Sequence, residues 1–382
     1  MMKPYTTRPP INLADYEACA TDKLEPAAWA YFSGGAGDEH TLADNLRAWG
    51  EISLMPRVLR DLTPLSTRCQ VLGRDLSHPI MVAPFAYQSI LDPKGEIACA
   101  YASAVLNAGF TLSAQSSCLL EDVAKAFLSE PDRGPLWHQL YWVADRNWMQ
   151  EHLLRIERAG FEAIVLTVDA PVHGVRDRER RSDFKLPQGI RAVNLPANQQ
   201  SSLTLTTACK VADPFLDLLA KAATWEDVNW LCQQTRLPVL LKGILHPSDA
   251  KQGVDAGCRG IIVSNHGGRT LDTAISTSVA LPRIRDAVGQ QPTVLVDGGL
   301  RRGTDILKAM ALGADAVMIA RPIAYALACA GMQGVAHAIR LLWDELKVAM
   351  ALTGSVNLRS IDKDLLQASF FHRTPEVPRS QP

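Results

Sequence analysis

The stretch from residue 260 to residue 272 reads GIIVSNHGGRTLD and says most about the fold. Its first part, Gly260–Val263, has the length and the β-branched side chains of a buried parallel strand. His266 and Arg269 follow directly, and the two glycines between them permit a tight turn. The sequence therefore predicts a titratable base and a fixed cation side by side at the carboxyl end of a buried strand.

Short apolar runs of the same kind recur along the chain and alternate with segments of helical periodicity. Eight runs predict strands, namely Pro79–Ala83, Phe110–Ser113, Leu136–Leu140, Ala163–Val168, Leu237–Leu241, Gly260–Val263, Thr293–Val296 and Asp315–Ala320. The helical pattern covers Glu96–Asn107, Arg146–Ala159, Asp217–Gln234, Pro247–Asp255 and Thr304–Ala311. Glycines near helix ends are interpreted as C-caps at Gly109, Gly160, Gly257 and Gly313.

This alternation predicts an α/β protein with an all-parallel sheet, and eight units favour closure into a (β/α)8 TIM barrel. A doubly wound open sheet is the alternative, but no G-x-G-x-x-G follows the first strand. We predict a single domain over 1–382, with an N-terminal helical extension over 1–78 and a closing helix over Arg340–Gly354. The interval after the fourth strand is too long for one unit, and 183–215 is interpreted as a polar, mobile insertion at the barrel mouth.

Composition and charge narrow the class of protein. Of the 382 residues, 47% are apolar and 21% are charged, as in globular rather than disordered chains. A net charge of −1 supplies no field to attract nucleic acid. We see neither an apolar signal region nor an apolar run of the ~18 residues that span a membrane, and we predict a cytoplasmic protein without a membrane anchor. Eight cysteines without a C-x-x-C pair predict reduced thiols rather than disulfides or a metal site.

Polar side chains stand at seven of the eight predicted strand ends, which favours a site for a large polar ligand. The last two ends, Asp297–Arg301 and Ala320-Arg321, combine glycine amides with arginines and suit a phosphate group. The alternative is that these arginines are surface cations that bind no phosphate. Lys242 either contacts the ligand or pairs with a neighbouring strand-end aspartate. We predict hydrogen bonds to the ligand from Ser113, Gln139 and Thr167. The alternative is that each of these residues only caps the helix that follows it.

A base beside a carboxylate-binding cation is what the oxidation of a 2-hydroxy acid requires. We predict that His266 is this base and that Asp169 accepts its N–H and fixes its tautomer. The alternative is that His266 is a core histidine whose hydrogen bonds are satisfied within the protein. Arg176 and Arg269 are predicted to clamp the substrate carboxylate, although Arg176 also fits a solvated run of charges.

The motifs, taken in order, resemble the FMN-dependent 2-hydroxy-acid oxidases and dehydrogenases, a family that includes glycolate oxidase, lactate oxidase, mandelate dehydrogenase and hydroxymandelate oxidase. The resemblance runs from Leu13 to Ile361 through YFSGG, APFAYQ, FTLS, HQLYW, LTVDAP, LLKGI, SNHGGRTLD, VDGGLRRG and ARP. It implies that His266 and Asp169 are catalytic and that substrate is bound by Tyr31, Tyr141, Arg176 and Arg269. It implies that FMN is held by Pro84, Phe85, Ala86, Ser113, Gln139, Thr167, Lys242, Ser264, Asp297, Gly298, Gly299, Arg301, Ala320 and Arg321.

The resemblance also implies the reaction. An (S)-2-hydroxy acid of the lactate, glycolate or mandelate kind is oxidised to the 2-oxo acid, and O2 accepts the electrons to give H2O2. A soluble dehydrogenase with a quinone or another acceptor is the alternative. A more distant one is an FMN-dependent isopentenyl diphosphate isomerase, against which the His–Arg arrangement argues. Because members of the family are commonly tetramers, we expect a homotetramer.

Three positions depart from the family pattern. Ala320 replaces the usual glycine before the phosphate-binding arginine. Gln115 replaces an aromatic residue and His173 an aliphatic one, at positions that shape the substrate side-chain pocket of glycolate oxidase. We therefore expect a more polar pocket than the one in that enzyme.

Overall fold

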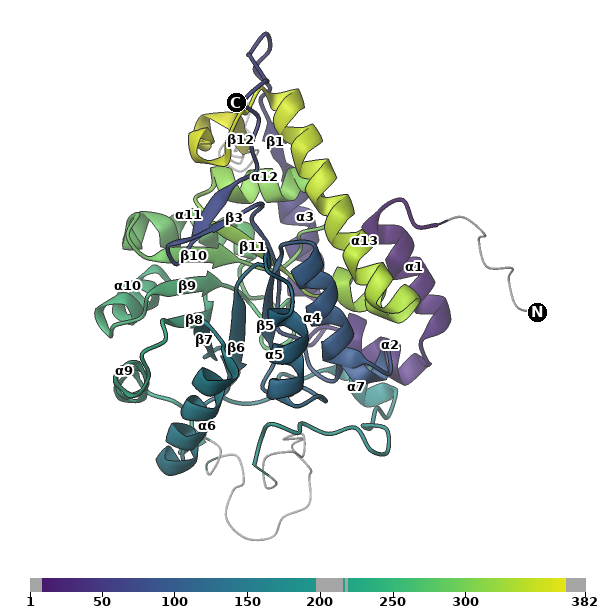
Figure 1. The fold of residues 1–382 in the computed structure, drawn as a ribbon, viewed down its shortest axis with the longest axis vertical. Helices are drawn as coiled ribbons and strands as arrows, with labels where there is room; N and C mark the ends of the chain where they lie inside the picture. The colour runs from purple at the N-terminus through teal and green to yellow at the C-terminus, as the bar shows by residue number, and fades with distance from the viewer. Residues whose placement is uncertain (1–8, 197–215, 217–218, 369–382) are drawn as a thin grey trace, which may run out of the picture.

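A closed parallel barrel forms the centre of the molecule in the computed structural model, which describes residues 9–196, 216 and 219–368 (Figure 1). The strands are β4 (Ile80–Val82), β5 (Gly109–Leu112), β6 (Leu136–Leu140), β7 (Ala163–Thr167), β8 (Val239–Ile244), β9 (Gly260–Val263), β10 (Thr293–Val296) and β11 (Ala316–Ile319). They close in chain order, with β11 hydrogen-bonded to β4. The predicted (β/α)8 barrel is confirmed.

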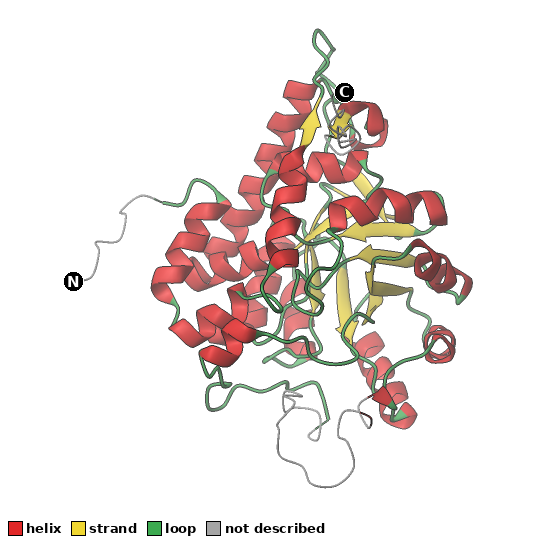
Figure 2. Ribbon diagram, turned by 180° about the vertical axis from the view of Figure 1, so that it is seen from behind, coloured by secondary structure: helices red, strands yellow, loops and turns green. Residues whose placement is uncertain are grey.

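Helices surround the strands, as Figure 2 shows. They are α4 (Gly95–Val105), α5 (Leu120–Leu128), α6 (Arg146–Ala159), α9 (Trp225–Gln234), α10 (Pro247–Asp255), α11 (Thr277–Val288) and α12 (Gly303–Ala311). Every residue of β5, β6, β7, β9 and β11 is buried, because side chains fill the barrel on one face and the helices cover the other.

The fifth predicted strand is shifted. It begins at Val239 instead of Leu237 and continues to Ile244, so Lys242 lies inside the strand rather than after it. The register with β9 changes between Lys242 and Ile244, at Gly243, whose φ is +106°. A Cβ at Gly243 would lie 2.4 Å from the Cβ of Asp169, so this bulge leaves room for the aspartate at the mouth.

Helix ends differ from the prediction at two places. Residues 217–218 of the helix expected over Asp217–Gln234 lie outside the described residues, and α9, which covers its later part, begins at Trp225, because Thr224 and Asp227 form a capping box there. Gly109 is the first residue of β5 and no helix cap; Asn107 takes the left-handed conformation instead, with φ +57°. The other three predicted caps, Gly160, Gly257 and Gly313, all have positive φ as expected.

The N-terminal extension is helical, as the sequence predicts, and its described residues form three helices and three short strands. These are α1 (Leu13–Lys23), α2 (Pro26–Ser33), α3 (His40–Glu51), β1 (Ile52–Leu54), β2 (Cys69–Val71) and β3 (Arg74–Leu76). Strand β1 pairs with β12 (Leu366–Ala368) near the other end of the chain. Short helical turns lie at η1 (Gln88–Ile90), α7 (Asp177–Arg181), η3 (Leu358–Ser360) and η4 (Lys363–Leu365).

The closing helix is much longer than predicted. Helix α13 runs from Arg321 to Thr353, with non-helical backbone at Ala330 and Gly331 that kinks it. It packs against α1, α4 and α12 (Figure 1). By length and composition it is apolar enough to cross a membrane, but 56% of its most apolar window is buried inside the protein. We interpret it as a core helix.

The prediction that all cysteines are reduced is wrong at one place. Cys19 of α1 and Cys329 of α13 form a disulfide, which joins the N-terminal extension to the closing helix. These two cysteines are 310 positions apart in the chain, so the spacing of cysteines gave no sign of the pair. Five other described cysteines are free thiols. No metal-binding group of histidine, cysteine or acidic side chains occurs among the described residues.

Candidate active site

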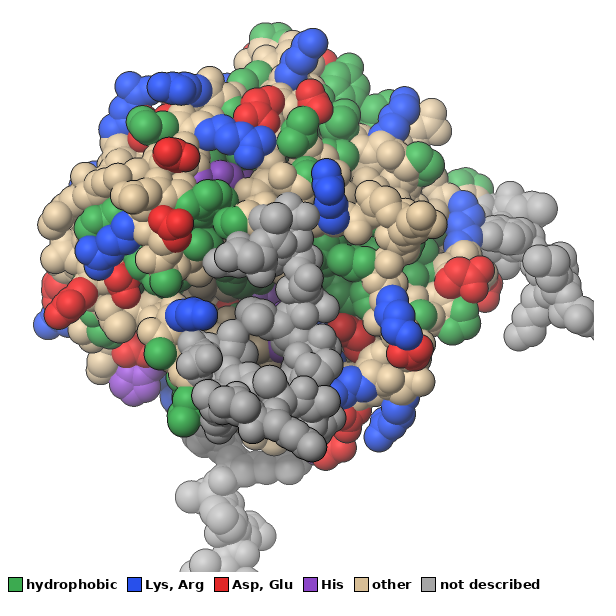
Figure 3. All heavy atoms as spheres, turned by 90° about the horizontal axis from the view of Figure 1, so that it is seen from below, with side chains coloured by type: hydrophobic (Ala, Val, Ile, Leu, Met, Phe, Trp, Pro, Cys, Tyr) green, Lys and Arg blue, Asp and Glu red, His purple; other side chains and the backbone are tan. Residues whose placement is uncertain are grey.

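A cavity of about 1490 Å³ opens at the carboxyl ends of the barrel strands. This is larger than the roughly 300–1,000 Å³ usual for a small-ligand pocket. Figure 3 shows the molecule from this side, with histidine side chains visible in the central hollow. All but two of the predicted site residues line this cavity; the two exceptions are Asp169 and Ser264. Both lie behind residues that do line it.

Asp169, directly after β7, holds His266 in place. The Asp169 Oδ1 atom lies 2.9 Å from Nδ1 of His266 and accepts its N–H. This pairing leaves Nε2 as the proton acceptor of a ring that lines the cavity. His266 has a φ of +58°, and its backbone N–H donates to Ser264 Oγ at 3.1 Å. The turn thus keeps the imidazole in an uncommon backbone conformation, as at many functional sites.

The charges in this pair suit a base. Burial lowers the pKa of His266, and this outweighs the opposing effect of Asp169. Burial raises the pKa of Asp169, but His266 and Lys242 outweigh it and the pKa is lowered. A neutral imidazole beside an ionised carboxylate is the form that takes up a proton.

Two buried arginines lie on one side of the cavity. Arg269 donates through Nη1 to the carbonyl oxygens of Tyr31 and Gly34, at 2.6 and 2.9 Å. Its guanidinium also lies over the Tyr31 ring, 5.2 Å from the ring centre. Arg176 donates through Nε to the carbonyl oxygen of Arg269 at 3.2 Å. Burial and the neighbouring Arg176 lower the pKa of Arg269 to about 9, so this site favours an anion.

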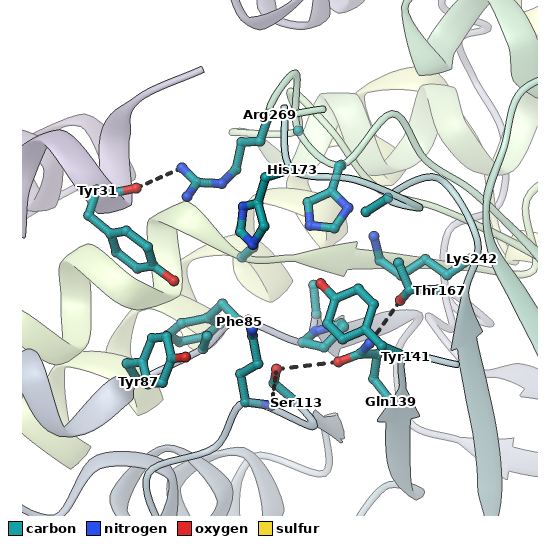
Figure 4. Close-up of a pocket in the computed structure, with 18 of the residues that line it drawn as sticks. Tyr31, Phe85, Tyr87, Ser113, Gln139, Tyr141, Thr167, His173, Lys242 and Arg269 are labelled. Carbon is teal, nitrogen blue, oxygen red and sulfur yellow. Dashed lines mark hydrogen bonds between the residues drawn. The ribbon is translucent and has the colours of Figure 1, made fainter. Parts of the chain in front are cut away.

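Aromatic residues border the same side of the cavity. Tyr31 stacks on Phe184, with ring centres 4.5 Å apart and planes 17° apart. Figure 4 shows Tyr31, His173 and Arg269 on one side of the cavity, and Ser113, Gln139 and Tyr141 on another. Burial raises the pKa of Tyr141, so its hydroxyl stays protonated and can donate a hydrogen bond. Burial lowers the pKa of His173 to about 4, and its ring is neutral near pH 7.

Opposite the arginines, polar side chains form a connected line across three strand ends. Gln139 accepts from Ser113 Oγ at 3.3 Å and donates to Thr167 Oγ1 at 3.0 Å (Figure 4). Lys242 Nζ lies 2.8 Å from Ser264 Oγ and 3.0 Å from Asp297 Oδ2. The predicted pairing of Lys242 with a strand-end aspartate is therefore confirmed. Lys242 also lines the cavity, and its contact with the ligand stays a prediction.

Residues 20–368 match the model of a family described as FMN-dependent dehydrogenase. The chain belongs to this family. It is 44% identical over 360 residues to an L-lactate oxidase of Nostoc sp., covering 94% of this chain and 98% of that protein. It is 42% identical over 344 residues to a 4-hydroxymandelate oxidase of Amycolatopsis orientalis, covering 90% and 94%. A mandelate oxidase crystal structure with (S)-2-phenylpropionate superposes with a TM-score of 0.83 at 40% identity, covering 94% and 98%.

The cavity fits the FMN that gives the family its name. Gly298 and Gly299 have φ of +89° and +86°, so the chain after β10 turns without side chains and leaves its backbone open to a ligand. Asp297 Oδ1 is buried and has no hydrogen-bond partner in the part of the chain that the structure describes, so it can accept from a ligand hydroxyl. Burial lowers the pKa of Lys242, but Asp297 and Asp169 outweigh it, so the residue remains a buried cation. A buried cation suits a ring that gains negative charge on reduction.

The two arginines predicted to bind phosphate differ in their surroundings. Arg301 lines the cavity and donates only to the carbonyl oxygen of Leu300 among the described residues. Arg321 donates to three carbonyl oxygens, those of Phe32, Gly34 and Gly267. Its guanidinium therefore joins the N-terminal extension to the loop that carries His266. The phosphate role of both arginines stays a prediction.

Four further residues of the site were missed by the sequence reasoning. Phe184 is an aromatic residue in the otherwise polar and charged run 176–185, a signal that could have suggested a contact with the site. Asn45 of α3 forms a reciprocal amide pair with Asn265, at 2.8 Å in both directions, and thereby fixes the residue before His266. Tyr87 and Glu179 line the cavity. No local pattern marks these last three, because they reach the site through tertiary contacts.

Proposed function

We propose that this protein oxidises an (S)-2-hydroxy acid to the 2-oxo acid with FMN, and that O2 is the final electron acceptor. The observation that carries the proposal is the His266–Asp169 pair beside Arg176 and Arg269 in one cavity. A base and a carboxylate clamp together are the groups that this reaction needs. The names of the relatives, L-lactate oxidase and 4-hydroxymandelate oxidase, support the same substrate class and acceptor.

The arginines and tyrosines orient the substrate in this proposal. Arg176 and Arg269 bind the carboxylate, and the protonated hydroxyls of Tyr31 and Tyr141 donate hydrogen bonds to it or to the 2-oxygen. Burial keeps both tyrosines protonated by raising the pKa of each hydroxyl. Because these four groups are fixed by the barrel and the N-terminal extension, they restrict the substrate to one orientation.

His266 removes a proton from the bound substrate through Nε2. Asp169 stabilises the imidazolium that results, since their 2.9 Å hydrogen bond becomes a charged pair. Bound FMN would accept two electrons and the second hydrogen of the substrate, and O2 would take these up with the proton from His266 as H2O2. Lys242 and the line of Ser113, Gln139 and Thr167 are proposed to hold the flavin ring, and Asp297–Arg301 with Ala320-Arg321 the ribityl phosphate.

One experiment tests the proposal. The purified holoprotein is mixed anaerobically with glycolate, (S)-lactate, (S)-mandelate and (S)-malate, and bleaching of the flavin absorbance is followed. Admission of air should restore the absorbance and produce H2O2 in proportion to the 2-oxo acid. Failure of every 2-hydroxy acid to bleach the flavin contradicts the proposed reaction. Bleaching that only a quinone reverses contradicts the oxygen acceptor and leaves the dehydrogenase alternative.

The cytoplasmic location and the homotetramer stay predictions. Light scattering of the purified holoprotein measures the oligomeric state directly.

A further inference from the structure

A negatively charged side chain, that of Glu179, lies close to the two arginines of the proposed substrate clamp. Glu179 belongs to α7 and lines the cavity. Its Oε2 atom lies 3.4 Å from Nη1 of Arg176 and 4.0 Å from Nη2 of Arg269. One carboxylate oxygen therefore faces both guanidinium groups.

The arginine pair needs such a counter-charge. The side chains of Arg176 and Arg269 are only 12% and 15% exposed, and their mutual repulsion is part of what lowers the pKa of Arg269. Glu179 acts in the opposite direction on Arg269. Among the ion pairs of the described residues, Glu179 is the carboxylate that pairs with either arginine.

The other hydrogen bonds of the arginines show what remains for a ligand. Nη1 of Arg269 is occupied by the carbonyl oxygens of Tyr31 and Gly34, and Nε of Arg176 by the carbonyl oxygen of Arg269. The atoms that Glu179 approaches, Nη1 of Arg176 and Nη2 of Arg269, do not take part in these bonds. A substrate carboxylate and the Glu179 carboxylate thus seek the same donors.

We propose that Glu179 occupies the place of the substrate carboxylate in the free protein. There it neutralises the arginine pair, and it competes with carboxylate ligands for the two arginines. This proposal rests on the proposed function, because it takes Arg176 and Arg269 as the carboxylate site. Glu179 is a residue that sets affinity, and it takes no part in proton transfer.

The position of α7 keeps the competitor close to the site. The next residue before it, Arg178, binds Glu39 and donates to Ser33 Oγ at 3.2 Å, so α7 is tied to the N-terminal extension. When a ligand carboxylate displaces Glu179, the glutamate stays tethered beside the clamp and returns when the ligand leaves. Because the 2-oxo acid product carries the same carboxylate, the competition shortens the stay of product as well as substrate.

The test measures binding without turnover. Flavin absorbance of the holoprotein is titrated with acetate and with pyruvate in the wild type and in Glu179→Gln. Asp177→Asn is the matched control, since it removes the same charge from the same helix, where Asp177 pairs with Arg180 and Arg181 at 3.9 and 3.8 Å. Lactamide, an uncharged 2-hydroxy amide, is the ligand control.

The Kd of both carboxylates should fall roughly threefold to tenfold in Glu179→Gln, the size expected for loss of a partly exposed competing ion pair. Asp177→Asn should leave Kd within about twofold, and lactamide binding should not change in any variant. Glu179→Asp keeps the charge on a shorter side chain and should give an intermediate Kd.

Unchanged or weaker carboxylate binding in Glu179→Gln overturns the proposal, as does an equal gain for lactamide. If Glu179→Gln does not retain FMN, the comparison of Glu179→Asp with the wild type decides, and an unchanged Kd there overturns the proposal. Failure of the proposed reaction is seen separately, as an absence of flavin bleaching by 2-hydroxy acids while acetate and pyruvate still bind.

Discussion

Single atoms decide the chemistry at the residue scale. The hydrogen bond from Nδ1 of His266 to Asp169 leaves one nitrogen of the ring to accept a proton, and burial keeps that ring neutral by lowering its pKa. The catalytic interpretation of His266 therefore depends on a residue 97 positions away in the chain.

Replacing His266 with glutamine removes the base but keeps a polar side chain of similar reach. We expect the rate of flavin reduction by the best 2-hydroxy acid to fall about 10²–10⁴-fold, the usual contribution of a general base. FMN content should not change, because the residues proposed to hold FMN are different ones. Anaerobic stopped-flow absorbance measures the rate, and reduction within tenfold of the wild-type rate would falsify the assignment.

Gln115 and His173 both line the cavity, and His173 is neutral near pH 7. This agrees with the more polar side-chain pocket expected from the sequence. His173→Leu and Gln115→Trp should each raise kcat/KM for lactate and mandelate relative to glycolate, by roughly tenfold, because the new side chains pack against the substrate side chain. Steady-state kinetics with the three acids measures the ratios; ratios that do not move remove the hypothesis.

At the scale of elements, the loop between β10 and α12 is shaped by contact with the N-terminal extension. Gly299 has a φ of +86°, and a Cβ there would lie 2.1 Å from the carbonyl oxygen of Asn45 in α3. Trp49 of the same helix donates to the carbonyl oxygen of Gly298 at 2.8 Å. Helix α3 thus sets the position of the loop proposed to bind the FMN phosphate, although it lies about 250 residues earlier in the chain.

Gly299→Ala should therefore destabilise the protein by roughly 3 kcal/mol or more, since backbone must move as well as adopt an unfavourable φ. Gly73→Ala, in the turn between β2 and β3, is the control: its φ is also positive, at +80°, but nothing lies within 4 Å of the added Cβ. The control should cost only about 1–2 kcal/mol. Thermal unfolding and the FMN-to-protein ratio measure both effects, and equal losses in the two variants would contradict the role of the α3 contact.

At the scale of the whole molecule, buried histidines link stability to pH. Burial lowers the pKa of His78 and His152 to about 4 and that of His138 well below its ordinary value. The unfolded chain binds protons on these histidines below about pH 6.5, whereas the folded protein does not. The stability they contribute is therefore present above pH 6.5 and is lost as the pH falls toward 4.

The free energy of unfolding should decrease by roughly 1 kcal/mol for each of these three histidines between pH 7.5 and pH 5.5. Urea unfolding at the two pH values measures the change. His138→Phe should reduce it, because His138 is fully buried and neither of its nitrogens has a hydrogen-bond partner among the described residues. A slope with pH that is the same in His138→Phe and wild type would contradict this account.

The sequence alone determined the barrel and most of the cavity lining. Parallel strands buried on both faces leave short apolar runs, and the fold places every strand end at one mouth, so strand-end residues such as Ser113, Gln139 and Thr167 could be assigned to a common site. The sequence could not predict that Lys242 lies inside a bulged strand, nor how long α13 is. Both features depend on packing against neighbouring elements.

Only the tertiary structure decided which residues act together across the chain. The disulfide of Cys19 with Cys329, the amide pair of Asn45 with Asn265 and the stacking of Phe184 on Tyr31 join segments that no local pattern connects. The same holds for Glu179, which reads as one charge in a solvated run and yet lies against both arginines of the clamp. Periodicity records what each segment buries, whereas contacts between distant segments depend on how the closed barrel and its extension pack.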